Sequence, residues 1–183
     1  MQSFGQVLTL MLDTSDPVQV RSTQIKSKRK ENLYAFLDGD SGMSTNEIDT
    51  QIWDPILNDW KNGLLLNEAF KNISFPPTKF NGFAFVGFRD NKAYFIQNGD
   101  MPIYFTNSQG DLKHLSGSGE HPAVDGAIFI LPSRKFLSGL SVESLAEFAR
   151  AYKFDMKAKK PDGLIGTSVF LYVGPQPRPA WAQ

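Results

Sequence analysis

The stretch FNGFAFVGFRDNKAYFIQNGDMPIYFTNSQGDLKHL, residues 80–115, contains four short β-like runs separated by turn-forming residues. The first two, Phe80–Phe88 and Lys92–Gln97, flank the turn sequence RDN, and both are rich in aromatic and β-branched residues. A second pair, Ile103–Thr106 and Asp111–Leu115, flanks the turn sequence NSQG. Short strands joined by tight turns predict an antiparallel meander over the whole stretch.

Three further β-like runs precede this stretch. Phe4–Leu12 and Val18–Ile25 are separated by the turn-forming sequence DTSDP, which favours their pairing as a hairpin. Leu33–Leu37 is apolar throughout and is followed by the loop sequence DGDSG, so we expect it to be a buried strand. This run and Phe83–Phe88 are predicted to be adjacent core strands, because both are almost entirely apolar.

Helices are predicted on both sides of the strand-rich centre. Between Thr45 and Ile73, apolar residues recur at steps of three and four with a break at Gly63, which indicates two helices. Ser141 can cap a further helix over Val142–Tyr152. We expect all of these helices to cover sheets.

The rest of the chain adds a loop, two strands and a tail. The loop is expected at residues 117–119 (Gly-Ser-Gly), and the strands at Ala127–Leu131 and Ser168–Val173. Residues 1–174 are predicted to form one domain, and the Pro-rich residues 175–183 an extended tail. The order of elements predicts an α/β (α+β) fold of antiparallel sheets with helices packed outside them.

The composition is that of a globular protein without a strong overall charge. The 183 residues contain 19 Lys and Arg, 19 Asp and Glu, and no cysteine. A balanced charge gives no general attraction for nucleic acid or an anionic membrane, and no run approaches the roughly 20 apolar residues of a membrane span. The lack of cysteine suits a reducing compartment. We therefore expect a soluble, cytoplasmic protein that binds neither nucleic acid nor membranes.

Several short motifs, in order along the chain, resemble those of the metal-dependent type-2C serine/threonine protein phosphatases. The sequence LDGDSG, residues 37–42, resembles the Asp-Gly-x-Gly-Gly loop, whose aspartate and following glycine carbonyl hold two metal ions in active members. The NGD sequence at residues 98–100 resembles the family's Gly-Asp step, and residues 166–171 resemble its last strand. The resemblance covers most of residues 33–173. It implies a four-layer α-β-β-α sandwich of mostly antiparallel sheets.

The sequence departs from the family where two metal-ligating carboxylates are expected. Residues 124–131 resemble the segment that precedes the family's Ser-Asp-Gly motif, but the sequence LPSR, residues 131–134, stands in place of that motif. A second carboxylate is expected just before the last strand, where Ile165 and Gly166 stand. Two of the three central metal-ligating aspartates are therefore missing. The resemblance implies a compact member with a metal site too depleted for ordinary catalysis.

The remaining candidate metal ligands are Asp38, Gly39, Asp40 and Asp100. Oxygen ligands of this kind suit Mg²⁺ and Mn²⁺, but a two-metal centre needs more carboxylates than these positions supply. We therefore expect either no cofactor or one weakly bound Mg²⁺ or Mn²⁺. The alternative is that the Asp-Gly-Asp sequence is an ordinary turn, because both residue types favour turns.

Two arginines are candidates for binding phosphate. The resemblance implies that an arginine near the basic stretch at residues 26–30 contacts the substrate phosphate. Arg21 and Arg29 are the candidates. We assign no catalytic residue. His114 and His121 have no second ligand at metal-site spacing, and no Gly-x-Ser-x-Gly sequence indicates a serine hydrolase.

Three functions are compatible with these observations. The first is a pseudophosphatase that acts in regulation by binding a protein partner or a phosphate group. The second is an active Mg²⁺- or Mn²⁺-dependent serine/threonine phosphatase in which shifted carboxylates, such as Asp155 or Asp162, rebuild the site. The third is a structural or assembly subunit, in which the Phe-rich strands and Trp181 of the tail dock on a neighbour.

Overall fold

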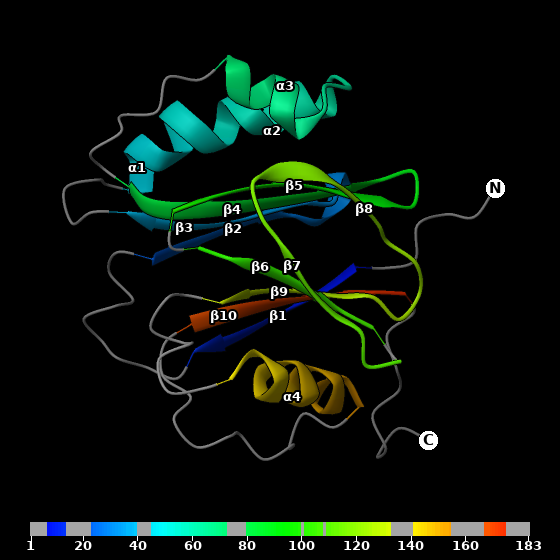
Figure 1. Ribbon diagram of the computed structural model, residues 1–183. Coiled ribbons are helices and arrows are strands. Elements are labelled where there is room, and N and C mark those ends of the chain that lie inside the picture. The colour runs from blue at the N-terminus through cyan, green and yellow to red at the C-terminus, as the bar shows by residue number, and fades with distance from the viewer. Residues whose placement is uncertain are drawn as a thin grey trace.

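The fold is a four-layer sandwich in which two β-sheets lie face to face between helices (Figure 1). The computed structural model describes residues 7–13, 23–39, 45–72, 80–99, 101–107, 109–132, 141–154 and 167–174. Each sheet has five strands, and all described strand pairs are antiparallel. The α-β-β-α architecture predicted from the sequence is confirmed.

The first sheet has the strand order β2-β3-β4-β5-β8. Its strands are β2 (Thr23–Lys28), β3 (Leu33–Gly39), β4 (Phe80–Arg89), β5 (Lys92–Gly99) and β8 (Ser118–Pro122). The pairing of β3 with β4 confirms that the two most apolar runs are adjacent core strands. Alternate residues of β3 face opposite layers: Leu33 packs with the helices, and Tyr34 packs with the second sheet. Burial on both faces explains why this strand is apolar throughout.

The second sheet has the strand order β1-β10-β9-β6-β7. Its strands are β1 (Val7–Asp13), β10 (Thr167–Val173), β9 (Ile128–Pro132), β6 (Ile103–Thr106) and β7 (Leu112–Leu115). β9 is buried along its whole length, because one face meets the first sheet and the other meets a helix.

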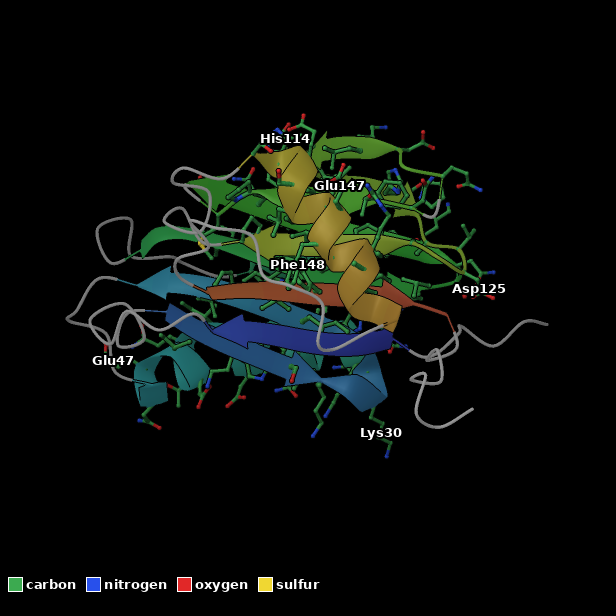
Figure 2. The ribbon with its side chains drawn as sticks, turned by 90° about the horizontal axis from the view of Figure 1, so that it is seen from below. Lys30, Glu47, His114, Asp125, Glu147 and Phe148 are labelled. Atoms are coloured by element: carbon green, nitrogen blue, oxygen red, sulfur yellow. The ribbon has the colours of Figure 1, made fainter. Side chains whose placement is uncertain are left out.

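Helices cover the outer faces of both sheets, as predicted. The first sheet carries α1 (Thr45–Ile48), the π-helical turn η2 (Asp49–Trp53), α2 (Asp54–Lys61) and α3 (Leu66–Lys71). The second sheet carries α4 (Val142–Phe154), which lies across it in Figure 2 with Phe148 packed on the sheet. The Ser141 hydroxyl accepts a hydrogen bond from the Ser144 amide at 3.1 Å, which confirms the predicted cap. None of the described helices has the length and apolar character of a membrane span.

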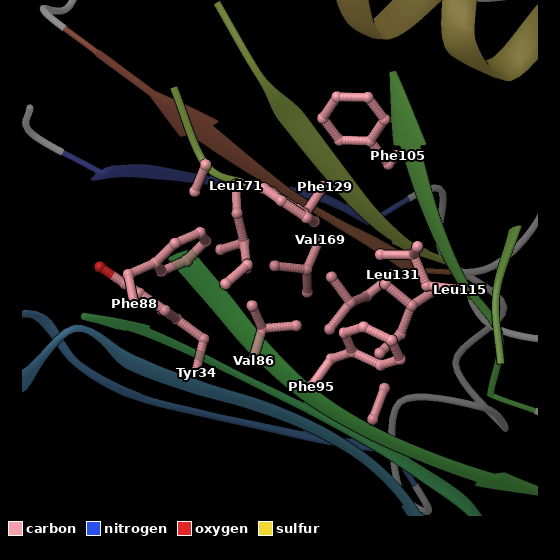
Figure 3. Close-up of a cluster of buried hydrophobic side chains, with 14 of the residues drawn as sticks. Tyr34, Val86, Phe88, Phe95, Phe105, Leu115, Phe129, Leu131, Val169 and Leu171 are labelled. Atoms are coloured by element: carbon pink, nitrogen blue, oxygen red, sulfur yellow. The ribbon is translucent and has the colours of Figure 1, made fainter. Parts of the chain in front are cut away.

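An aromatic-rich core fills the space between the sheets (Figure 3). Phe88 of β4 contacts Phe129 of β9 edge-on, with ring centroids 5.4 Å apart, and Phe105 of β6 lies 5.4 Å from the same ring. Phe129 is completely buried. The contact between Phe88 and Phe129 joins the two sheets and places the start of β9 over the end of β4.

The predicted opening hairpin is wrong. β1 pairs with β10 in the second sheet, and β2 pairs with β3 in the first, so the chain crosses from one sheet to the other between them. The turn-forming residues of DTSDP indicate that a strand ends there, but they do not determine which strand it pairs with. The pairing of β1 with β10 joins the two ends of the chain, and no local pattern reports it.

The predicted meander is also only partly correct. The hairpins β4–β5 and β6–β7 form as expected, but they belong to different sheets. The loop expected at residues 117–119 is wrong as well, because Ser118 begins β8, which pairs with β5. Gly119 lies against the ring of Phe95, where an added Cβ would be 3.3 Å from Phe95 Cζ. The glycine therefore serves close packing in a paired strand and does not mark a loop.

Candidate functional site

The strand ends that carry the phosphatase-like motifs meet at one end of the sandwich. In the first sheet Gly39 pairs with Phe80, and Gly82 pairs with Gly99. In the second sheet Ser168 pairs with Pro132, so the end of β9 lies beside the start of β10. The contact between Phe88 and Phe129 places the start of β9 at the far end of β4, so β9 ends where β4 begins. We call this end, at the left of Figure 1, the loop end.

Asp38 and Gly39 are the last two residues of β3 and lie at the loop end. Asp38 pairs with Thr23 on one side and with Gly82 on the other. The register of β3 against β4 shifts between Asp38 and Gly39, which is a β-bulge or irregularity. Such irregularities often stand next to functional sites, where they redirect the chain as it leaves a strand. The backbone thus places the Asp-Gly sequence at the end of a strand.

The other predicted ligands and one predicted arginine fall outside the described residues. They are Asp40, Asp100 and Arg21. Their nearest described neighbours all lie at the loop end: Gly39 precedes Asp40, Gly99 precedes Asp100, and Thr23 follows Arg21 by two positions. The topology therefore brings together the chain segments that carry these candidates.

Arg29 is not brought to the loop end. It lies in η1 (Arg29–Glu31), the 3-10 turn that connects β2 to β3. In that hairpin Lys28 pairs with Leu33 and Thr23 pairs with Asp38, so the turn and Asp38 lie at opposite ends of the two strands. Of the two phosphate-binding candidates, only Arg21 has a neighbouring segment at the loop end.

The two positions that lack the expected carboxylates also border the loop end. Pro132 is the last residue of β9 and Thr167 is the first of β10. The chain continues from the former with Ser133 and Arg134, and it reaches the latter through Ile165 and Gly166. These four residues are outside the described part of the structure. Their side chains contain no carboxylate, so the second sheet supplies no acid from these two strand ends.

Asp13 is an acidic residue at the loop end that the sequence did not indicate. It is the last residue of β1 and pairs with Thr167 of β10. The hairpin prediction had assigned it to a local turn, and only the distant pairing of β1 with β10 reveals its position. The alternation of apolar residues through LTLML, residues 8–12, indicates the strand that ends at this aspartate but does not indicate its partner.

Within the described ranges, no group of three or more His, Cys, Asp or Glu residues could hold a metal ion. Both histidines have aromatic neighbours in place of ligands. The ring of His114 lies 5.0 Å from that of Tyr104, and the ring of His121 lies 4.2 Å from that of Phe105.

The pKa shifts resolved in the described residues arise away from the loop end. A hydrogen bond and Coulombic attraction from Glu120 raise the pKa of Lys92, which lies at the opposite end of β5 from Gly99. Burial raises the pKa of Tyr104, and the nearby Glu143 carboxylate raises it further. Perturbed pKa values often accompany catalytic sites. These two have local structural causes and do not indicate an acid–base pair.

Comparison with known proteins shows the fold. No protein-family model matches the sequence, and no curated protein matches it significantly. Three similar solved structures are PppA, described as a key regulatory component of the T6SS in Pseudomonas aeruginosa, the serine/threonine phosphatase PstP/Ppp of Mycobacterium tuberculosis, and RsbX in complex with magnesium. Their TM-scores are 0.63, 0.64 and 0.61 at 12%, 14% and 14% identity. The matches cover 93%, 92% and 95% of this chain and 99%, 99% and 98% of the respective structures. The chain therefore has the fold of the type-2C phosphatases.

Proposed function

We propose that this chain, with its type-2C phosphatase fold, is a regulatory binding module without appreciable phosphatase turnover. The observation that supports this proposal most strongly is the sequence at two strand ends of the second sheet. Pro132 and Thr167 border the loop end, yet the segments that continue from them carry no carboxylate where the family resemblance implies metal ligands. The acids that the structure describes at these strand ends are Asp38, next to the last residue of β3, and Asp13, the last residue of β1.

The chemistry of a two-metal centre explains the expected loss of turnover. Two hard cations a few ångströms apart need several carboxylate oxygens to hold them and to activate a water molecule. The PstP catalytic domain has been solved with 2 manganese ions. The four candidate donors are too few for two such ions. Asp38, the Gly39 carbonyl, Asp40 and Asp100 would hold at most one weakly bound Mg²⁺ or Mn²⁺, with water in the remaining positions.

A regulatory role is supported by the kind of protein that shares the fold. PppA is described as a regulatory component of a secretion system. A type-2C fold offers a preformed surface to a protein partner, and Arg21, two positions before the start of β2 in the sequence, is our candidate for binding a phosphorylated one. The lack of cysteine is consistent with a cytoplasmic location. A structural or assembly subunit is an alternative of another class.

Purified protein with millimolar Mn²⁺ is expected to hydrolyse an aryl phosphate no faster than the same protein with EDTA. The physical reason is the missing pair of carboxylates. Product release measured by absorbance provides the test, with Asp38→Ala as the matched variant. Mn²⁺-dependent turnover that Asp38→Ala abolishes would overturn the proposal. It would instead support an active enzyme in which Asp155, Asp162 or Asp13 rebuilds the site.

Mg²⁺ or Mn²⁺ is expected to raise the melting temperature only slightly and only at high concentration. At a free concentration equal to the dissociation constant, the ion adds about 0.4 kcal/mol, or about 1–2 °C for a chain of this size. Differential scanning fluorimetry across a metal titration measures the shift. Asp38→Asn should abolish it and leave the melting temperature without metal nearly unchanged.

The matched control for this substitution is Asp90→Asn. Asp90 lies in the exposed β4–β5 turn, at the opposite end of β4 from the loop end, and has a positive φ of 53° that asparagine also tolerates. It should keep the wild-type metal response. If wild type and Asp38→Asn respond identically, the Asp-Gly-Asp sequence is only a turn, and the binding module retains no part of a metal site.

A further inference from the structure

β8 leaves one edge of the first sheet open. It is the last strand in the order β2-β3-β4-β5-β8, and in the described part of the chain no strand pairs with its outer side. Ser118, Gly119 and Glu120 are exposed. An open strand edge presents a row of backbone donors and acceptors that an extended peptide can pair with.

The register determines which backbone groups of β8 point outward. The Gln97 amide donates to the Gly117 carbonyl at 2.7 Å, and the Ala123 amide donates to the Asn91 carbonyl at 2.9 Å. In an antiparallel pair the inward-facing residues alternate, so the N–H and C=O groups of Ser118 and Glu120 point away from β5. Pro122 has no N–H, so the row of outward-pointing donors ends before it. The open edge is therefore short, and its donors are the amides of Ser118 and Glu120.

A cleft of about 180 Å³ lies beside this edge. Its lining includes Leu65 and Leu66 before and at the start of α3, Tyr94 of β5, and Ser118 and Glu120 of β8. Small-molecule sites usually measure about 300–1,000 Å³, so this cleft fits one side chain better than a cofactor. Side chains of an added strand alternate between the two faces of a sheet, and every second one would lie on the face that carries the cleft.

The negative charge of Glu120 in the cleft favours a cationic side chain. Glu120 is the charged residue of its lining, and the aromatic ring of Tyr94 is suited to contact with a cation. Glu120 accepts a hydrogen bond from Lys92 at 3.1 Å, but both side chains are about half exposed, at 53% and 48%. An exposed pair of this kind contributes little to stability, so a second cation can compete with Lys92 for the carboxylate.

We propose that the β8 edge binds an extended segment of a partner protein and that the cleft takes a lysine or arginine side chain of that segment. This surface lies away from the loop end and needs no metal. Its test therefore stands apart from that of the proposed function, and either can fail without the other.

Titration with two synthetic peptides tests this proposal. The probes are Thr-Val-Thr-Lys-Thr-Val-Thr and the same peptide with Glu in place of Lys, both capped at their ends. Binding is measured from the chemical shifts of the backbone amides of isotope-labelled protein. The lysine peptide should shift the Ser118 and Glu120 amides and bind at least about ten-fold more tightly than the glutamate peptide. Glu120→Gln should reduce this preference to about two-fold or less. Failure of the lysine peptide to bind at millimolar concentration would overturn the proposal.

Ser118→Pro removes an outward donor and should weaken binding of the lysine peptide by about ten-fold or more. The matched control is Ser27→Pro on β2, at the opposite edge of the same sheet. Ser27 is also exposed, and the register of β2 with β3 directs its backbone N–H away from the sheet. It should leave binding unchanged, and equal losses in the two variants would contradict the proposal. If Ser118→Pro does not fold, a lysine peptide N-methylated at the amides that face β8 gives the same test. Shifts at Ser118 and Glu120 that depend on protein concentration without peptide would instead assign the edge to a second copy of this chain.

Discussion

Replacing Trp60 with alanine is expected to lower the free energy of unfolding by about 4 kcal/mol, the range for deleting a large buried aromatic side chain. Trp60 is only 1% exposed. Its indole N–H donates to the Glu31 carbonyl at 2.7 Å, and the guanidinium of Arg89 lies 3.8 Å from the ring centroid. Arg89 also donates to the Trp60 carbonyl at 2.6 Å. One side chain thus connects α2, the β2–β3 turn and the end of β4.

Gly87 provides the means to test this connection. A Cβ added at Gly87 would lie 2.7 Å from Trp60 Cη2 and 2.8 Å from Cζ2, so the indole ring would have to move. Gly87→Ala should therefore cost about 1–3 kcal/mol in the wild type, as overpacking does. In the Trp60→Ala background the same substitution should cost close to nothing, because the clash is gone.

Urea unfolding of the four proteins in this cycle measures the coupling. Asn58→Ala is the control on the same helix, because Asn58 is exposed, and it should change the free energy of unfolding by less than about 0.5 kcal/mol. Equal costs of Gly87→Ala in both backgrounds would show that the contact between Gly87 and Trp60 does not determine the packing of α2 on the sheet.

The parts of the fold that the sequence predicted are those with a local pattern. The strand at Leu33–Leu37 was identified because burial on both faces requires a continuous apolar run. The helices between Thr45 and Ile73 were identified because burial of one helical face requires apolar residues at steps of three and four. The partner of β1 was missed because its pairing with β10 connects residues about 160 positions apart along the chain. A turn signal reports where a strand ends and carries no information on its neighbour in the sheet.

In the candidate site, too, local motifs could be predicted from the sequence and positions set by distant strand pairing could not. The Asp-Gly sequence at residues 38–39 was found because a motif is contiguous in the chain, and the structure places it at a strand end beside the other motif-bearing segments. Asp13 reaches that end only through the register with Thr167, and Arg29 leaves it through the register of β2 with β3. Motifs in the sequence could therefore suggest candidate ligands. Only the pairing of the strands could show which of them lie on segments that reach the loop end.

We expect the stability of the two-sheet core to be independent of the loop end, and Phe129 provides the test. Its ring is completely buried between the sheets, 5.4 Å from both Phe88 and Phe105 and 6.0 Å from His121. Phe129→Ala should lower the free energy of unfolding by about 3–5 kcal/mol, because it removes contacts from both sheets and leaves a cavity that the rigid strands cannot close. Phe129→Leu retains most of the volume and should cost about 1 kcal/mol.

Chemical denaturation of these variants beside Asp38→Asn separates the core from the site. Phe129 lies near the start of β9, and the position where the family resemblance implies a carboxylate follows the end of the same strand. A protein that kept its core for a binding surface while losing its metal ligands should be strongly destabilised by Phe129→Ala and hardly affected by Asp38→Asn without metal. The reverse result, with Asp38→Asn costing more than Phe129→Ala, would mean that the Asp38 carboxylate is a structural part of the fold. The loop end would then be a stabilising cluster and not the remnant of a metal site.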